Sequence, residues 1–336
     1  MTTTVDVEML TVYASDFSAS PQPQPFPLQG SKRGQVPIIN RLLPIDCARI
    51  VEPFCGSAAV SVGARYYRKT DRVAISDSNL SLMRLWQAIL SDPSGLGDRY
   101  TQVWSDQLEP HGPSREIDTR AYFNMVRERY NNAGAEEGDP ADFLFLLNKI
   151  VKGALRYGSS GRMNQSADGR RLGAKPSTVR TRLMATSAVL QGASATCRDY
   201  ADVLEESSPE DVIYLDPPYQ GTTDTHDKRY ISGLSVDDFE QEVRGATERD
   251  LSLIISYDAL RGEAIYGRPL DPAIGLVPLD VVTGVSAQGT LLGRKQEAHE
   301  TIYLSPALVE RLGGVDEVRF RVSSGVSDQS GLLIEM

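Results

Sequence analysis

Short apolar runs alternate with amphipathic stretches along much of the chain. The runs have the length of buried β-strands, and small-residue turns lead from several of them into segments of helical period. Residues 79–90 have the clearest such period, with one apolar face formed by Leu82, Leu85, Trp86 and Ile89. Strands are predicted at 49–52, 72–76, 195–198, 211–215, 251–256, 279–285, 301–304 and, as an edge strand, 317–322. Strands joined by helices predict an α/β fold with parallel strands and right-handed crossovers.

The α/β pattern is interrupted in the middle of the chain. Between about residues 91 and 190 the sequence is punctuated by Gly and Pro. Helices are predicted there at 118–130, 141–152 and 176–190, and another near the N-terminus at 36–43. We therefore expect a sheet divided by an inserted, mostly helical domain. The expected parts are a flexible Pro-rich arm (1–27), an α/β domain (28–100 and 191–310), the inserted domain (101–190) and a C-terminal extension (311–336).

Composition narrows the class of protein. The 336 residues are 40% hydrophobic and 24% charged, which is ordinary for a folded domain with a sizeable core. No apolar run has the length of a membrane span, and the N-terminus lacks a signal-peptide pattern. The three cysteines form no CxxC pair, and the three histidines are not at metal-ligand spacing. We expect a cytoplasmic protein without a metal site or membrane partner.

Charge is unevenly distributed along the chain. The net charge is −10, yet residues 149–182 hold nine basic residues and one acid, so this segment is +8 and the remainder −18. Such a segment would attract a polyanion despite the acidic whole. The residues expected to contact nucleic acid are Lys149, Lys152, Arg156, Arg162, Asn164, Arg170, Arg171 and Lys175.

The strongest chemical signal is Asp216-Pro217-Pro218-Tyr219, directly after the apolar run 211–215. Two prolines end the strand in a rigid turn at the carboxyl edge of the sheet, where α/β folds bind ligands. The carboxylate of Asp216 and the carbonyl of Pro217 could accept hydrogen bonds from an exocyclic amine of a nucleobase. That would direct the nitrogen lone pair at an electrophile, while Tyr219 stacks on a base that has left its duplex.

Other candidate ligand contacts lie at strand ends and near the N-terminus. Glu52 ends a predicted strand and leads through Pro53, Phe54 and Gly56 into a helix whose first N–H groups would face a ligand. Asp77 ends the next strand, where an acid can bind the hydroxyls of a ribose. Lys32, in the segment Gly30-Ser31-Lys32-Arg33, could reach a carboxylate.

Taken in order, PLQGSKRG, VEPFCGS, ISDSN, the basic segment and DPPY resemble the Dam-type, alpha-ordered DNA adenine methyltransferases. FLFLLNKIVKGALRYGSSGRMN and SAQGTLLGRKQEAHETIYL are similar to later blocks of that family, so the resemblance spans about residues 28–305. It implies a Rossmann-like methyltransferase sheet with an inserted target-recognition domain. One departure is Ala58, where the family usually has Gly.

The resemblance also implies roles for the residues at the strand ends. Asp216, Pro217, Pro218 and Tyr219 would activate the amine and stack on the base. S-adenosylmethionine would be bound by Lys32 at its methionine carboxylate, by Glu52, Pro53, Phe54 and Gly56, by Asp77 at its ribose, and by Asp216.

The expected reaction is direct methyl transfer to adenine N6 in a short sequence of double-stranded DNA. Alternatives are methylation of cytosine N4 or of an RNA adenine, and a non-catalytic DNA-binding protein on the same fold. A nucleotide-dependent oxidoreductase is disfavoured because no GxGxxG pattern is present. We further expect a monomer, and a cognate restriction endonuclease is a possible partner.

Overall fold

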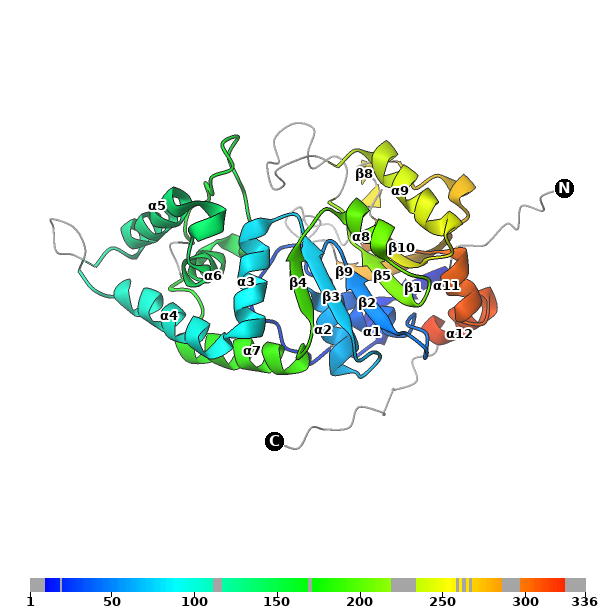
Figure 1. Ribbon diagram of the computed structural model, residues 1–336, viewed down its shortest axis with the longest axis horizontal. Coiled ribbons are helices and arrows are strands. Elements are labelled where there is room, and N and C mark those ends of the chain that lie inside the picture. Colours follow the sequence, from blue (N-terminus) through cyan, green and yellow to red (C-terminus); the bar gives the residue numbers. More distant parts are fainter. Residues whose placement is uncertain are drawn as a thin grey trace.

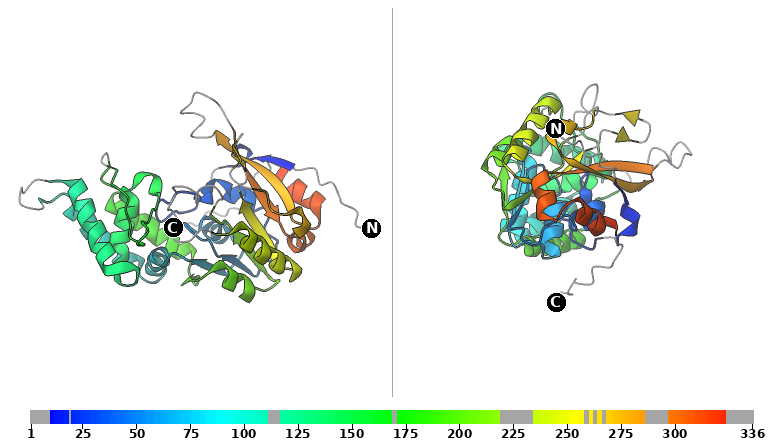
Figure 2. Two further views of the ribbon diagram at one scale, coloured as in Figure 1. Left: turned by 90° about the horizontal axis from the view of Figure 1, so that it is seen from above. Right: turned by 90° about the vertical axis from the view of Figure 1, so that its right-hand side faces the viewer.

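The computed structural model describes residues 10–18, 20–110, 117–168, 171–218, 234–257, 260–261, 264–265, 268–285 and 297–323. Its main feature is a mixed sheet with helices on both faces, and a helical lobe lies to one side of that sheet (Figure 1). Figure 2 shows the lobe extending away from the strands in the view from above.

The sheet has eight strands in the order β1-β9-β10-β6-β5-β2-β3-β4. Strands β4, β3, β2, β5 and β6 are mutually parallel, whereas β10 runs antiparallel to both of its neighbours. The strands are β1 (Leu10–Tyr13), β2 (Arg49–Glu52), β3 (Val73–Asp77), β4 (Ser194–Cys197), β5 (Asp211–Leu215), β6 (Ser252–Tyr257), β9 (Val277–Val285) and β10 (Glu297–Leu304), with a separate hairpin of β7 (Leu260–Arg261) and β8 (Ala264–Ile265). This arrangement confirms the predicted α/β class.

Strand order reverses between β2 and β5. From β2 the chain proceeds outward through β3 to β4, and it later returns to β5 and proceeds through β6 on the other side. The carboxyl ends of β2 and β5 therefore border a topological switch point, where open α/β sheets form their ligand crevice.

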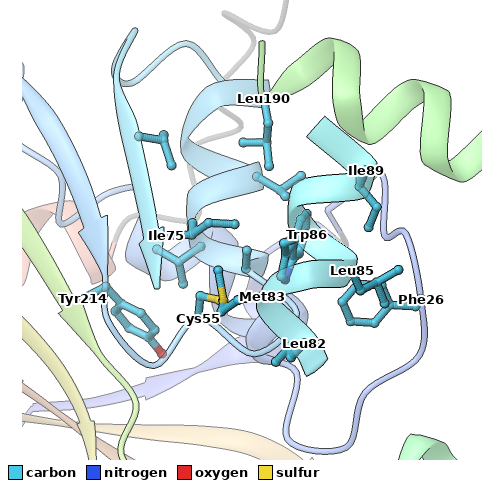
Figure 3. Packing of buried hydrophobic residues seen from close by; sticks show 14 of the residues in the cluster. Phe26, Cys55, Ile75, Leu82, Met83, Leu85, Trp86, Ile89, Leu190 and Tyr214 are labelled. Carbon is cyan, nitrogen blue, oxygen red and sulfur yellow. The ribbon is translucent and has the colours of Figure 1, made fainter. Parts of the chain in front are cut away.

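Successive side chains of a strand point to opposite faces of the sheet, and each face has its own hydrophobic core. Ile50 and Tyr214 pack on one face with helices α1 to α3, and Figure 3 shows part of this cluster around Trp86. Val51 and Ile213 point to the opposite face and pack with α8 and α9. The helices of the α/β part are α1 (Val36–Ile39), α2 (Ala59–Tyr66), α3 (Leu80–Ser91), α8 (Tyr200–Glu206), α9 (Val236–Glu248), α11 (Pro306–Arg311) and α12 (Val315–Ser323).

The lobe consists of helices that pack on one another and on α3. They are α4 (Pro93–Asp106), α5 (Thr119–Glu137), α6 (Pro140–Lys149) and α7 (Pro176–Val189). The expected boundary between residues 100 and 101 is wrong, because it falls inside α4, whose residues pack on α6 and α7. A boundary near Asp92, which caps α4 through its side chain, follows the structure.

Two predicted elements differ from the structure. Residues 317–322 form part of α12 rather than an edge strand, because Val318 and Val322 are buried at helical i, i+4 spacing while Phe320 is 65% exposed. The helix predicted at 36–43 is shorter: a 3₁₀ turn occupies Lys32–Gln35, and α1 ends at Ile39.

The described residues of the N-terminal segment, 10–18 and 20–27, are not the flexible arm that the Pro-rich composition predicts. Strand β1 pairs in parallel with β9, and the Gln22 amide donates to the carbonyl of Ala59 at 2.9 Å. Phe26 is fully buried, with its ring edge against Trp86 at a centroid distance of 5.4 Å (Figure 3). The described part of 1–27 is therefore a component of the core.

Replacement of Phe26 by Ala should test this packing. Loss of a fully buried aromatic ring is expected to lower the free energy of unfolding by about 3–5 kcal/mol. Urea denaturation measures it, with Phe320→Ala as a matched control, since that exposed ring should change stability by at most about 0.5 kcal/mol. Equal, small effects in both variants would contradict the assignment of residues 20–27 to the core.

Candidate active site

Three carboxylates meet at the carboxyl edge of the sheet, from three adjacent strands. Glu52 ends β2, Asp77 ends β3, and Asp216 follows the last residue of β5. Because β5, β2 and β3 are parallel neighbours, their carboxyl ends point the same way. The structure thus brings together the acids that the sequence singled out, at the switch point of the sheet.

Asp216 is held by an ammonium group. The Nζ of Lys32 donates to Asp216 Oδ1 at 2.7 Å and lies 2.9 Å from Glu300 Oε1 on β10. Although burial opposes its charge, the carboxylates of Asp216 and Glu300 keep the pKa of Lys32 well above its usual range. Pro217 is buried and Pro218 is half-buried, whereas Tyr219 lies outside the described residues.

The turn after β2 brings backbone close to the acidic edge. Gly56 has a φ of +48°, its N–H donates to Asp77 Oδ2 at 3.2 Å, and its carbonyl accepts from Trp86 Nε1 at 2.9 Å. Pro53 is buried, and the half-buried ring of Phe54 stacks on Tyr200. Ala58, where the family usually has Gly, also adopts a left-handed conformation, at φ +48°.

Burial changes the acidity of two of the carboxyl groups. Glu52 is enclosed beneath α2 and accepts a hydrogen bond from the backbone N–H of Ser61 at 2.9 Å. Burial outweighs that bond and raises the pKa of Glu52 to about 8. Burial also raises the pKa of Asp77, against the opposing effect of the N–H groups of Asn79 and Gly56.

Asn79 connects the acidic edge to the helical lobe. Its side chain caps α3 by accepting from the N–H of Leu82, and its amide donates to the hydroxyl of Tyr157 at 2.9 Å. Tyr157 belongs to the basic segment, and its backbone forms an isolated antiparallel β-bridge with Met163. The sequence pattern gives no signal for the link between Asn79 and Tyr157.

The basic segment divides into buried and exposed residues. The expectation that Lys149 contacts nucleic acid is wrong: it is 1% exposed, and its Nζ donates to Gln107 Oε1 and to the carbonyl of Thr119. Arg162 is paired with Glu128 at 2.9 Å, and Arg171 lies 3.5 Å from Asp168. Arg156, Asn164, Arg171 and Lys175 are exposed. The side chain of Lys152 and all of Arg170 lie outside the described residues.

Sequence reasoning missed Glu300 and Gln35. Glu300 is buried on β10, and one of its oxygens accepts a hydrogen bond from the side-chain amide of Gln35. The only signal in the sequence was an acid within the apolar strand end ETIYL, where charge is unusual.

Comparison with known proteins gives the class of this site. The family described as D12 class N6 adenine-specific DNA methyltransferase matches residues 29–264, and the chain belongs to it. The chain is therefore a DNA N6-adenine methyltransferase that uses S-adenosylmethionine, built on the Rossmann-like sheet expected for such enzymes. The family confirms the expected methylation of adenine N6 in DNA. It disfavours the alternatives, which were methylation of cytosine N4, methylation of an RNA adenine and an oxidoreductase.

Individual relatives are distant. The chain is 24% identical to the retron Ec67 DNA adenine methylase of Escherichia coli over 237 residues, which are 70% of this chain and 73% of that protein. It is 24% identical to a DNA adenine methylase of Vibrio cholerae over 244 residues, 70% of this chain and 82% of the relative. It is 26% identical to the DNA adenine methylase of Escherichia coli K12 over 191 residues, which are 56% of this chain and 62% of that protein.

The residues at the carboxyl edge fit the cofactor that the family uses. S-adenosylmethionine carries a positive sulfonium, a ribose and an amino-acid end. The carboxyl groups of Asp77 and Asp216 suit the hydroxyl groups and the positive charge, whereas Glu52 is buried and has a raised pKa. Gly56 leaves the turn after β2 without a Cβ, which at this position would lie 3.3 Å from the side chain of Leu28. Among the described residues, no group of three or more metal-ligating side chains is found, and no helix is long and apolar enough to cross a bilayer.

Replacement of Glu52 by Gln should change how stability depends on pH. The pKa of Glu52 is raised on folding, so its contribution to stability is present at low pH and is lost as the pH rises from its usual range through about 8. Gln removes this loss, and we expect the difference in unfolding free energy between variant and wild type to move in favour of the variant between pH 5 and 8.5. Urea midpoints at several pH values measure it. Parallel curves for the two proteins would contradict the raised pKa.

Proposed function

We propose that the enzyme methylates adenine N6 at one short sequence in double-stranded DNA, with Asp216, Pro217, Pro218 and Tyr219 at the reacting amine. The observation that carries this proposal is the position of Asp216. It directly follows β5 at the switch point of the sheet, it is held by Lys32, and its side chain remains 18% exposed. A carboxylate placed in this way can accept hydrogen bonds from an amine that enters the crevice.

In the proposed reaction, adenine leaves the helical stack at a cost of a few kcal/mol and enters the crevice beside Asp216. Asp216 and the carbonyl of Pro217 accept hydrogen bonds from the amine, and Tyr219 stacks on the base. S-adenosylmethionine supplies the methyl group and leaves as S-adenosylhomocysteine. As the new N–C bond forms and the S–C bond breaks, the nitrogen becomes positive, and it then loses a proton, for which Asp216 is the proposed acceptor. Orientation and electrostatics provide the acceleration.

The proposed cofactor contacts are those that the sequence indicated: Lys32, Glu52, Pro53, Phe54, Gly56, Asp77 and Asp216. Asp77 supports this set because its oxygens already order the turn through the N–H groups of Gly56 and Asn79. Lys32 is engaged by Asp216 and Glu300, so its contact with the methionine carboxylate would have to be made from that position.

We propose the exposed part of the basic segment as the DNA contact surface. Its backbone is anchored on the lobe, because the Asn131 side chain bonds both the N–H and the carbonyl of Met163, each at 2.9 Å. Arg156 and Asn164 are exposed on either side of this anchored segment. Lys152, Arg162, Arg170, Arg171 and Lys175 remain proposed contacts, whereas Lys149 is excluded by its burial.

Assay of plasmid DNA would test the function as a whole. Labelled methyl from S-adenosylmethionine, followed by single-molecule sequencing, is expected to show N6-methyladenine at one short motif. Label scattered over unrelated adenines, or confined to single strands, would overturn the site-specific, double-stranded proposal. A monomeric state, a cytoplasmic location and a cognate restriction endonuclease remain proposals that rest on the DNA substrate of the family.

Replacement of Asp216 by Asn or Ala should separate chemistry from binding. Loss of the charged acceptor is expected to lower the rate of methyl transfer by roughly 100-fold or more. Calorimetric titration should still show binding of S-adenosylmethionine by both variants. Normal turnover in either variant would end the proposed role of Asp216.

Two substitutions within the basic segment should have opposite consequences. Arg156→Ala should weaken DNA binding and reduce the slope of log K against log salt by about 1, because one phosphate contact is lost. Lys149→Met should leave that slope unchanged and lower stability, because Gln107 loses a buried partner. Fluorescence anisotropy over a range of salt concentrations measures the first effect and urea denaturation the second. A reduced slope for Lys149→Met would contradict its interior position.

A further inference from the structure

A buried chain of polar contacts continues from Asp216 away from the crevice. Lys32 joins Asp216 to Glu300 with N–O distances of 2.7 and 2.9 Å, and Gln35 donates to the second carboxyl oxygen of Glu300. The groups come from the 3₁₀ turn Lys32–Gln35, from β10 and from the end of β5. The side chain of Glu300 is 10% exposed, and burial of a carboxylate is unfavourable unless the group is paired and hydrogen-bonded.

We propose that Glu300 is a positioning residue for methyl transfer, which holds Lys32 against Asp216 and shares its positive charge. The inference rests on the proposed role of Asp216. One ammonium and two carboxylates carry a net charge of −1. If Lys32 had Asp216 as its only carboxylate partner, the pair would be neutral and Asp216 would be a weaker acceptor for the amine hydrogens. Because the Lys32 ammonium also pairs with Glu300, it compensates the charge of Asp216 only in part, and Asp216 remains a strong hydrogen-bond acceptor.

Among the residues that the structure describes, two further titratable groups that act on this cluster are Tyr214 and Glu52. Tyr214 on β5 is buried with its hydroxyl bonded to Ser256, and burial raises its pKa well above the usual range, so it stays neutral. Glu52 on β2 has a pKa of about 8 and is mostly protonated at pH 7. Of these described groups, Lys32 and Glu300 therefore carry the charge next to Asp216.

Glu300→Gln is the direct test, because it keeps the size of the side chain and removes its charge. We expect kcat to fall about 10-fold or more while KM for S-adenosylmethionine changes by less than about 3-fold. Glu300→Asp should recover part of kcat. Lys32 should lose its proton at lower pH when the Glu300 carboxylate is gone, so the alkaline limb of the kcat profile should move to lower pH in Glu300→Gln.

Glu240→Gln provides a matched control. The side chain of Glu240 is also 10% exposed and pairs with Arg268 at 2.7 Å, on α9 and away from Lys32. It should show the stability cost of removing the charge of a buried carboxylate, here one that pairs with a half-exposed arginine, with kcat within about 2-fold of wild type and no change in the pH profile. Gln35→Ala offers a milder second variant that leaves Glu300 charged. It should lower kcat by a few-fold, and it keeps the test decisive if Glu300→Gln does not fold.

The outcomes separate the inference from the proposed function. The inference alone would be overturned if Glu300→Gln had the kcat of the control variant while the wild-type enzyme methylated DNA and Asp216→Asn was inactive. A loss confined to KM for S-adenosylmethionine would overturn it as well, by assigning Glu300 to cofactor binding. Normal activity of Asp216→Asn would instead reject the proposed role of Asp216 itself.

Discussion

The ion pair between Lys32 and Asp216 is the contact on which the arrangement of the site depends. It fixes a carboxylate at the end of β5 to a turn near the N-terminus, across 184 residues of sequence. A charge buried at this depth must be paired, so the turn that carries Lys32 has to pack against the sheet edge for the fold to be stable. The same requirement explains why Glu300 and Gln35 lie next to it.

A second constraint is the parallel order of β5, β2 and β3. It brings Asp216, Glu52 and Asp77 to one edge, yet it gives them different environments. Glu52 is covered by α2 and is difficult to ionise, whereas Asp216 pairs with the Lys32 ammonium and reaches solvent. One sheet edge thus holds a buried acid with a raised pKa and, beside it, an acid that is paired with an ammonium and reaches solvent.

Local patterns predicted the parts of this arrangement that depend on few residues. Strands β2 and β5 were predicted with the bounds that they have, because a short apolar run between turn residues has few alternatives. The acids Glu52, Asp77 and Asp216 followed from their place at strand ends. Glu300 could not be found in this way, since its partners Lys32 and Gln35 are more than 260 residues away. The charge count predicted that Lys149 is exposed, because a count carries no information on burial. The Pro-rich composition of residues 1–27 gave no sign that Phe26 is buried.

The pairing of β1 with β9 has a consequence for biosynthesis. Leu10 faces Leu279, and Lys32 meets Glu300, so the segment that carries Leu10 and Lys32 must wait until β9 and β10 have been synthesised before it can pack against them. Contacts of such sequence separation slow folding and leave apolar surface open in the meantime. A nascent chain that ends before β10 has Asp216 but lacks Glu300, and its N-terminal segment has no completed sheet edge to join. Assembly of the polar group around Asp216 therefore requires that β10 has been synthesised.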